Sequence, residues 1–173
     1  MLDLIIKNGA CYIDNNLKDI DIGVQSGKIV EIGKIEEKAN QLIDATGLTV
    51  LPGCIDTQTH FREPGSTDTE DLSSGSKAAI VGGITSVFEM PNTNPATTNR
   101  DEFKKKINLA NNRMYCNHAF YFGATPDNQN ELANLKDLEG CCGVKLFAGS
   151  STGTLLVHKE EDIEKVFEST SKI

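Results

Sequence analysis

From about residue 50 onward, short apolar segments alternate with segments whose apolar residues recur at helical spacing. Short apolar runs are typical of strands buried in a parallel sheet, and the segments between them are long enough for crossover helices. The predicted strands span residues 50–55, 84–90, 116–123 and 143–148. This alternation indicates successive βα units that build a parallel sheet.

The first two crossover segments carry helix signals. Asp68–Asp71 supplies amino-terminal caps for a helix that ends at Gly82 and Gly83. Asn99 with Glu102 three residues later resembles a capping box for a second helix. The apolar face of that second helix consists of Phe103, Ile107 and Ala110.

Two further helices follow from apolar spacing alone. The residues that carry the pattern are Leu132, Leu135 and Leu138 for a third helix and Ile163, Val166 and Phe167 for the last one. The one basic run of the chain, Lys104–Lys106, lies in the second predicted helix. We interpret it as a solvated helix face, the usual environment of a charge run.

Residues 1–50 have a different pattern, made of short alternating pieces separated by turn residues at 15–16, 27–28 and 47. They predict a small β-rich module without catalytic residues. We place the boundary near Thr49 and Val50, so that residues 51–173 hold about four βα units.

Such units belong either to a (β/α)₈ barrel or to a doubly wound sheet. A complete barrel needs about 250 residues, so a chain of 173 residues holds only its first half. Against the doubly wound sheet, no dinucleotide or P-loop glycine motif follows the first strand, and the segment 149–153 lacks a phosphate-binding lysine. The expected fold is α/β: the amino-terminal portion of a TIM-type barrel, incomplete in this chain, after a β-sandwich-like module.

Composition excludes several function classes. The net charge of -8 and the pI of about 4.9 lack the basic footprint of nucleic-acid binding. No apolar run reaches the length of a membrane span and no leader pattern opens the chain, so we expect a cytoplasmic protein. The five cysteines show no CxxC pair and are expected to be buried free thiols.

Polar side chains gather where the first predicted strand ends. Strand alternation predicts that Asp56, Gln58 and His60 share one face. His60 is a candidate metal ligand, and the alternative is a hydrogen-bonded structural histidine. Arg62 is able to bind a carboxylate or phosphate in bidentate fashion, and the alternative is a surface ion pair with Glu63.

Lys145 lies in an apolar strand, where a buried ammonium is costly unless it is paired or chemically altered. Schiff-base chemistry or carboxylation would suit it, and a lysine that extends to solvent is the alternative. Asn92 and Asn94 follow the second strand, where a barrel places ligand-contacting loops, although turn chemistry also explains them. His118 and His158 have no partner at metal-ligand spacing, and we interpret both as structural.

Three segments in order, Gly53–Gly65, Met90–Pro95 and Gly143–Gly153, together resemble the dihydroorotases of the amidohydrolase superfamily. The resemblance covers essentially the whole chain. The leading β-rich module is similar to that family's amino-terminal contribution to a small β-sandwich, which precedes a metal-dependent barrel.

The resemblance implies a role for each matching residue. His60 would belong to an HxH zinc pair, Lys145 would be a carboxylated lysine that bridges two zinc ions, and Arg62 with Asn92 would hold the substrate carboxylate. The implied activity is reversible, metal-dependent hydrolysis of the cyclic amide of dihydroorotate to carbamoyl aspartate, in de novo pyrimidine biosynthesis. Gln58 stands at the first HxH position, where an amide is a weaker ligand than imidazole.

The resemblance also implies two later metal-binding histidines and a general acid/base aspartate beyond Ile173, so we expect residues 1–173 alone to be an inactive fragment. Dihydropyrimidinases, hydantoinases and allantoinases are alternatives on the same scaffold. An alternative of another class is a non-catalytic dihydroorotase-like partner of aspartate transcarbamoylase. The expected partners are thus a small-molecule substrate and either a homodimer mate or that enzyme, with no nucleic acid or membrane.

Overall fold

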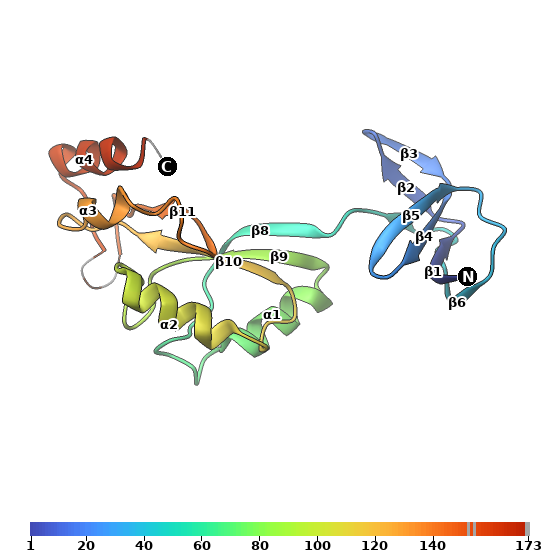
Figure 1. The fold of residues 1–173 in the computed structure, drawn as a ribbon, viewed down its shortest axis with the longest axis horizontal. Helices are drawn as coiled ribbons and strands as arrows, with labels where there is room; N and C mark the ends of the chain where they lie inside the picture. The colour runs from blue at the N-terminus through green and yellow to red at the C-terminus, as the bar shows by residue number, and fades with distance from the viewer. Residues whose placement is uncertain (152, 154, 172–173) are drawn as a thin grey trace. The chain divides into compact units, whose positions relative to one another are not determined.

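The computed structural model describes residues 1–151, 153 and 155–171 (Figure 1). The predicted loop 149–153 therefore contains one residue, Thr152, outside the described residues. The contacts divide the chain into two units, Met1–Pro52 and Gly53–Ile173.

The first unit consists of strands, drawn blue to cyan in Figure 1. They are β1 (Leu2–Lys7), β2 (Ala10–Ile13), β3 (Asn16–Asp19), β4 (Asp21–Gln25), β5 (Lys28–Gly33), β6 (Ala39–Asp44) and β7 (Thr49–Val50). One sheet has the order β5-β4-β1-β6 and the other β3-β2-β7. Asp14 and Asn15 join β2 to β3 with positive φ at both positions, the requirement of a two-residue hairpin turn that matches strand twist.

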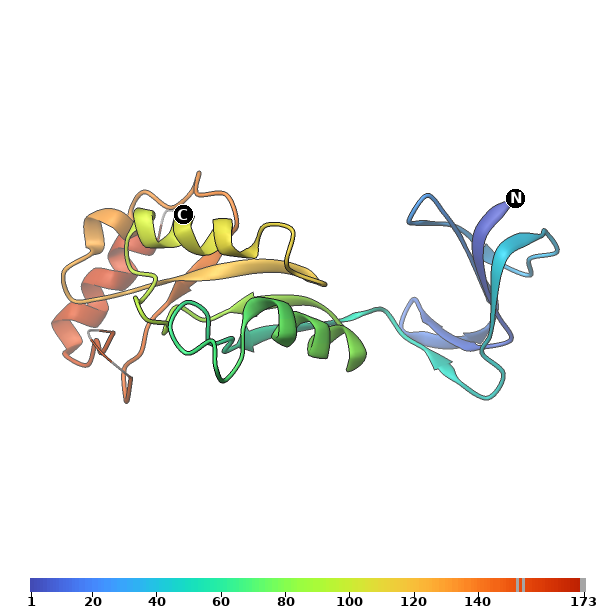
Figure 2. The same ribbon diagram turned by 90° about the horizontal axis from the view of Figure 1, so that it is seen from below.

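The second unit contains a parallel sheet with helices between its strands. The strands are β8 (Cys54–Thr59), β9 (Ile84–Glu89), β10 (Asn117–Gly123) and β11 (Cys141–Lys145). The helices are α1 (Leu72–Val81), α2 (Arg100–Ala110), α3 (Gln129–Leu132) and α4 (Glu160–Thr170). Helices α1 and α2 lie side by side on one face of the sheet (Figures 1 and 2).

The sheet order β11-β10-β9-β8 follows the chain without reversal. A doubly wound sheet reverses its strand order at a switch point, whereas a βα barrel adds each strand beside the last. The second unit is therefore a portion of a (β/α)₈ barrel, with a four-stranded sheet that does not close on itself. Every helix in the described ranges is too short or too polar to cross a lipid bilayer.

Both predicted amino-terminal caps are confirmed. Asp71 caps α1, and its Oδ1 accepts a hydrogen bond of 2.6 Å from Ser74 N. Asn99 caps α2 by accepting from Glu102 N at 2.9 Å. The Glu102 carboxylate instead pairs with Lys105, so the capping box is only half formed.

The apolar spacing in the last third of the chain was a weaker guide. Helix α3 ends at Leu132, so the prediction that Leu135 and Leu138 continue it is wrong. Both leucines are buried in turns instead, with Leu138 N bonded to Leu135 O. The two leucines are thus buried without belonging to a helix. In α4, Val166 is buried but Phe167 is 66% exposed, so only part of the predicted apolar face is buried.

The first barrel strand begins later than predicted. Val50 belongs to β7 of the first unit, and β8 starts at Cys54, so the polar residues from Asp56 to Thr59 lie within the strand. Asp56 aligns with Val87 and Thr59 with Glu89, so an advance of three residues along β8 is paired with an advance of two residues along β9. This bulge breaks the alternation, so Asp56 is out of phase with His60, contrary to the predicted shared face.

The cysteines are all free, as predicted. Cys11 and Cys116 are buried, and Cys141 and Cys142 are half-buried. Burial raises the pKa of Cys142 to about 12. Cys54 is exposed, because β8 is at the edge of the described sheet, and the prediction of burial is wrong for this thiol.

One ion pair lies inside the core between α2 and the sheet. The ammonium of Lys106 contacts the carboxylate of Glu89, and the two side chains are 1% and 0% exposed. Lys106 also donates to the carbonyl of Met90 at 2.9 Å and lies 5.3 Å from the ring centroid of Phe120. The interpretation of Lys104–Lys106 as a solvated face is therefore wrong for its third residue.

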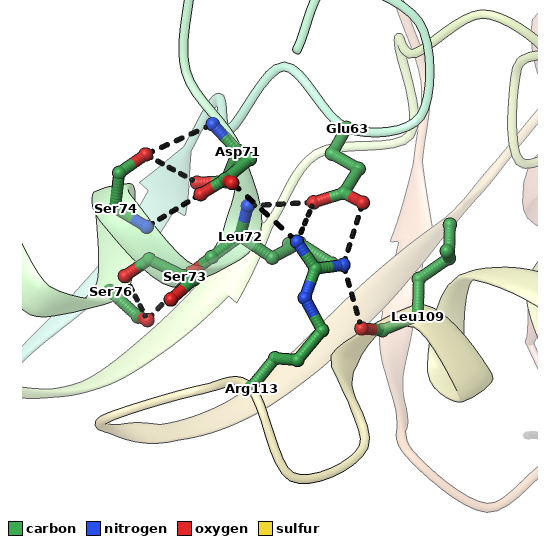
Figure 3. Close-up of polar contacts among 8 residues, drawn as sticks. All are labelled: Glu63, Asp71, Leu72, Ser73, Ser74, Ser76, Leu109 and Arg113. Carbon is green, nitrogen blue, oxygen red and sulfur yellow. Dashed lines mark hydrogen bonds and ion pairs between the residues drawn. The ribbon is translucent and has the colours of Figure 1, made fainter.

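A second charged cluster joins the loop after β8 to both helices (Figure 3). Glu63 is 7% exposed, and its two oxygens accept hydrogen bonds of 2.7 and 2.9 Å from the guanidinium of Arg113. It also accepts one of 2.9 Å from the backbone N–H of Leu72, at the start of α1. The alternative that paired Glu63 with Arg62 is therefore wrong, because Glu63 is held by a residue 50 positions away.

Stability should fall with rising pH because of Glu89. Burial raises its pKa from 4.5 to about 8, against the opposing charges of Lys106 and Arg62. Between these values the folded chain holds a proton that the unfolded chain has released, so the free energy of unfolding decreases as pH rises. We expect Glu89→Gln to remove at least about 1 kcal/mol of this decrease between about pH 5 and pH 8, measured by urea unfolding. Equal pH slopes in both proteins would contradict the assignment.

Replacing Arg113 with Met should destabilise the second unit. The buried Glu63 carboxylate would keep only the Leu72 N–H as donor, which should cost about 1–3 kcal/mol of unfolding free energy. Lys105→Met is the matched control, because Lys105 is a cation of α2 whose pair with Glu102 is exposed to solvent. Urea unfolding should show a loss only for Arg113→Met, and similar losses in the two variants would refute the clamp.

Candidate functional site

The parallel sheet brings three of the predicted site residues to the end of the sheet where its strands terminate. His60 directly follows β8, Asn92 comes shortly after β9, and Lys145 is the last residue of β11. Parallel strands present their carboxyl ends on the same side, which is where ligands bind in barrels of this type. Residues separated by up to 85 positions in the chain, from His60 to Lys145, therefore share one rim.

The best-defined contact of this rim joins His60 to Asn92. His60 Nδ1 lies 2.8 Å from Asn92 Oδ1, and both side chains are partly buried. An amide oxygen only accepts hydrogen bonds, so Nδ1 carries the proton and donates it. When the ring is neutral, this tautomer leaves the lone pair on Nε2, the arrangement in which imidazole binds a metal ion.

Arg62 and Asn92 line the same small cleft, whose volume is about 220 Å³. Its other lining residues are Pro64, Ser66, Thr93 and Asn94. The loops after β8 and β9 form its walls, and Asn94 N donates to Pro64 O at 3.0 Å. Gly65 has a φ of +121°, and a Cβ there would lie 2.9 Å from the Asn94 Cβ, so glycine permits this close approach.

The other two predicted ligands are Gln58 and Lys145. Gln58 is exposed, and its backbone N–H is held by Asp56 Oδ1 at 2.9 Å across the bulge. Lys145 is half-buried, and its ammonium lies 5.1 Å from the ring centroid of Phe147. That contact is a cation–π interaction, which partly compensates the cation for lost water.

A metal ion would find part of a ligand set here. Among residues 1–151, 153 and 155–171, no group of three or more His, Cys, Asp or Glu side chains is arranged to hold one. Nε2 of a neutral His60 ring would nevertheless suit a divalent ion. Lys145 would add an oxygen ligand only as a carbamate.

The other histidines lie elsewhere. His118 is near the start of β10, at the opposite end of the strand from the rim, and lines a separate cleft of about 860 Å³ beside α2. Its ring is 5.6 Å from that of Phe120. His158 is exposed ahead of α4. Neither lies with His60 at the rim.

Sequence reasoning missed the charged residues that hold the rim loops from below. For Lys106 a signal existed, because it follows Phe103 by three positions and precedes Ala110 by four, on the apolar face of α2. Glu89 likewise stands within an apolar strand. For Glu63 and Arg113 no local spacing indicates the pairing, which only the tertiary fold creates.

The curated proteins similar to this chain include allantoinases. An allantoinase of Salmonella choleraesuis is 42% identical over 149 residues, which are 86% of this chain and 33% of that protein. An allantoinase of Salmonella paratyphi B is 41% identical over the same shares. The chain thus spans about a third of the length of the curated relatives it matches.

The solved structures agree in fold. An L-hydantoinase (dihydropyrimidinase) from Arthrobacter aurescens has a TM-score of 0.88 and 30% identity, covering 99% of this chain and 39% of that one. A dihydropyrimidinase from Brevibacillus agri has a TM-score of 0.81 at 25% identity, with shares of 99% and 38%. These names do not support the specific expectation of a dihydroorotase and favour the alternatives on the same scaffold.

The family comparison rests on the segment that holds the rim. The sequence model described as "Amidohydrolase family" matches residues 49–150, more than half of the chain. That segment contains His60, Arg62, Asn92 and Lys145 together with the four parallel strands that position them. The chain belongs to the amidohydrolase family.

Proposed function

We propose that this chain supplies part of the active site of a metal-dependent cyclic amidohydrolase that opens the ring amide of allantoin or of a hydantoin. The observation that carries the proposal is the His60–Asn92 contact at the rim that also holds Lys145. The names of the relatives and of the solved structures support a ring ureide as substrate.

Each rim residue has a role in the proposal. Asn92 accepts the Nδ1 proton of His60 and so keeps Nε2 free to bind the ion. Lys145, as a carbamate, would bind it with an anionic oxygen, which also removes the cost of its own half-buried cation. A divalent cation, zinc in our proposal, supplies Lewis acidity toward the ring carbonyl.

In the proposal, the substrate binds in the cleft that Arg62 and Asn92 line. Arg62 presents guanidinium donors and Asn92 and Asn94 present amide groups to a space of about 220 Å³. A ureide ring carries carbonyl acceptors and N–H donors, and such groups match this lining. Gln58 would add a neutral amide oxygen as a weak ligand.

Activity should depend on His60 and on metal. We expect the gene product that contains residues 1–173 to open allantoin or hydantoin faster than dihydroorotate, and to lose this activity to a chelator. His60→Ala should lower turnover at least about a hundredfold, because it removes a ligand rather than a supporting residue. His158→Ala is the matched control, since that histidine is exposed and away from the rim.

Two outcomes would count against this proposal. Unchanged turnover in His60→Ala would reject its role as a ligand. A protein that binds no metal and opens none of the rings would favour the non-catalytic partner of aspartate transcarbamoylase. That residues 1–173 alone have no activity stays a prediction, which turnover by the purified 173-residue chain would contradict.

A second candidate substrate is a ring with a carboxylate, such as dihydroorotate. The specific observation in its favour is that Arg62 and Asn92 line one cleft, the arrangement in which a guanidinium and an amide bind a carboxylate. This candidate would restore the dihydroorotase function that the resemblance implied.

Arg62→Ala separates the two candidates. Loss of a charge-assisted hydrogen bond to a carboxylate should lower kcat/KM for dihydroorotate about 10- to 100-fold. Hydantoin, which has no carboxylate, is the matched control substrate, and its kcat/KM should fall much less. Equal losses for both rings would reject the role of Arg62 as a carboxylate clamp.

A further inference from the structure

The buried pair of Lys106 and Glu89 lies directly beneath the rim. Glu89 is the last residue of β9, and Lys106 reaches it from the apolar face of α2. The same ammonium donates to the carbonyl of Met90 at 2.9 Å. Met90 lies one residue past the end of β9, where the hydrogen bonds of the sheet stop. The Lys106 side chain therefore supplies the donor for its carbonyl.

A short series of contacts connects this carbonyl to His60. Met90 N donates to Thr59 O at 2.9 Å, which ties Met90 to the residue before His60. Two residues after Met90, Asn92 Oδ1 accepts from the His60 imidazole at 2.8 Å. Met90 is therefore held on one side by Lys106 and on the other by β8.

Stability alone does not explain two ionisable side chains in this place. Burial disfavours the charged form of each, and apolar residues of similar volume often replace a buried ion pair without loss of stability. The surroundings are apolar, with Phe103, Phe120 and Val87 fully buried nearby. Methionines would fill this space, but they have no donor for the Met90 carbonyl.

We infer that Lys106 and Glu89 act as positioning residues for His60: Lys106 holds the Met90 carbonyl, Glu89 holds Lys106, and the strand end so fixed sets Asn92 against the imidazole. The consequence for catalysis rests on the proposed function. The positioning itself does not rest on the proposed function, because it concerns only which nitrogen of the His60 ring carries the proton. Burial also makes both charged forms costly, which raises the pKa of Glu89 and lowers that of Lys106.

The double variant Glu89→Met/Lys106→Met tests the inference. It removes both ionisable groups at nearly constant volume, so the second unit should stay folded. In the unaltered chain, ¹⁵N spectra of the imidazole should show His60 protonated at Nδ1. In the double variant the ring should become a mixture of both tautomers, because Asn92 is no longer held in place. Lys105→Met, an exposed change on the same helix, should leave the tautomer unchanged.

A folded double variant that keeps His60 wholly protonated at Nδ1 would overturn the inference. A second measurement on the unaltered chain covers the case in which the variant does not fold. The Lys106 ammonium should exchange its protons with water far more slowly than that of Lys105, and its nitrogen should show coupling across the hydrogen bond to the Met90 carbonyl carbon. Exchange as fast as at Lys105 would equally overturn it. A chain that passes these tests yet opens no ring would refute the proposed function alone.

Discussion

Parallel hydrogen bonding among β8, β9, β10 and β11 determines which residues of the second unit share its rim. Parallel strands all terminate at the same end of a sheet, and each crossover helix returns the chain to the opposite end, where the next strand starts. His60, Asn92 and Lys145 are distant in sequence and lie on one rim only because of this connectivity. The chemistry of the rim is therefore a property of strand order, to which each strand contributes one or two polar residues.

Charged residues below the rim hold its loops more firmly than apolar packing would. Glu63 receives three hydrogen bonds, from the Arg113 guanidinium and the Leu72 N–H, and thereby joins the loop after β8 to α1 and to the end of α2 (Figure 3). Lys106 and Glu89 do the same for the loop after β9. Directional bonds of this kind define where a loop lies, whereas apolar contacts tolerate sliding. Both clusters support residues of the predicted site.

Family membership and substrate are decided by different residues. The motifs around His60 and Lys145 lie within the segment that matches the amidohydrolase family, so they pointed to the superfamily and could not separate its members. Arg62 and Asn92 were the basis for preferring dihydroorotate, yet the similar proteins are named allantoinase and hydantoinase. A guanidinium binds a carboxylate and also the carbonyl oxygens of a ureide ring, and this chemical breadth explains why the more specific expectation was not supported.

Local sequence signals were enough to predict the βα alternation, the caps at Asp71 and Asn99, and the candidate residues, because these depend on neighbours within a few positions of the chain. Three features were visible only in the packed fold: Glu63 pairs with Arg113, a bulge puts Asp56 out of phase with His60, and Lys106 is buried. Those features arise from contacts between distant segments. A residue's partner across a sheet or beneath a helix is not encoded by its own spacing, and only the packed fold brings the two together.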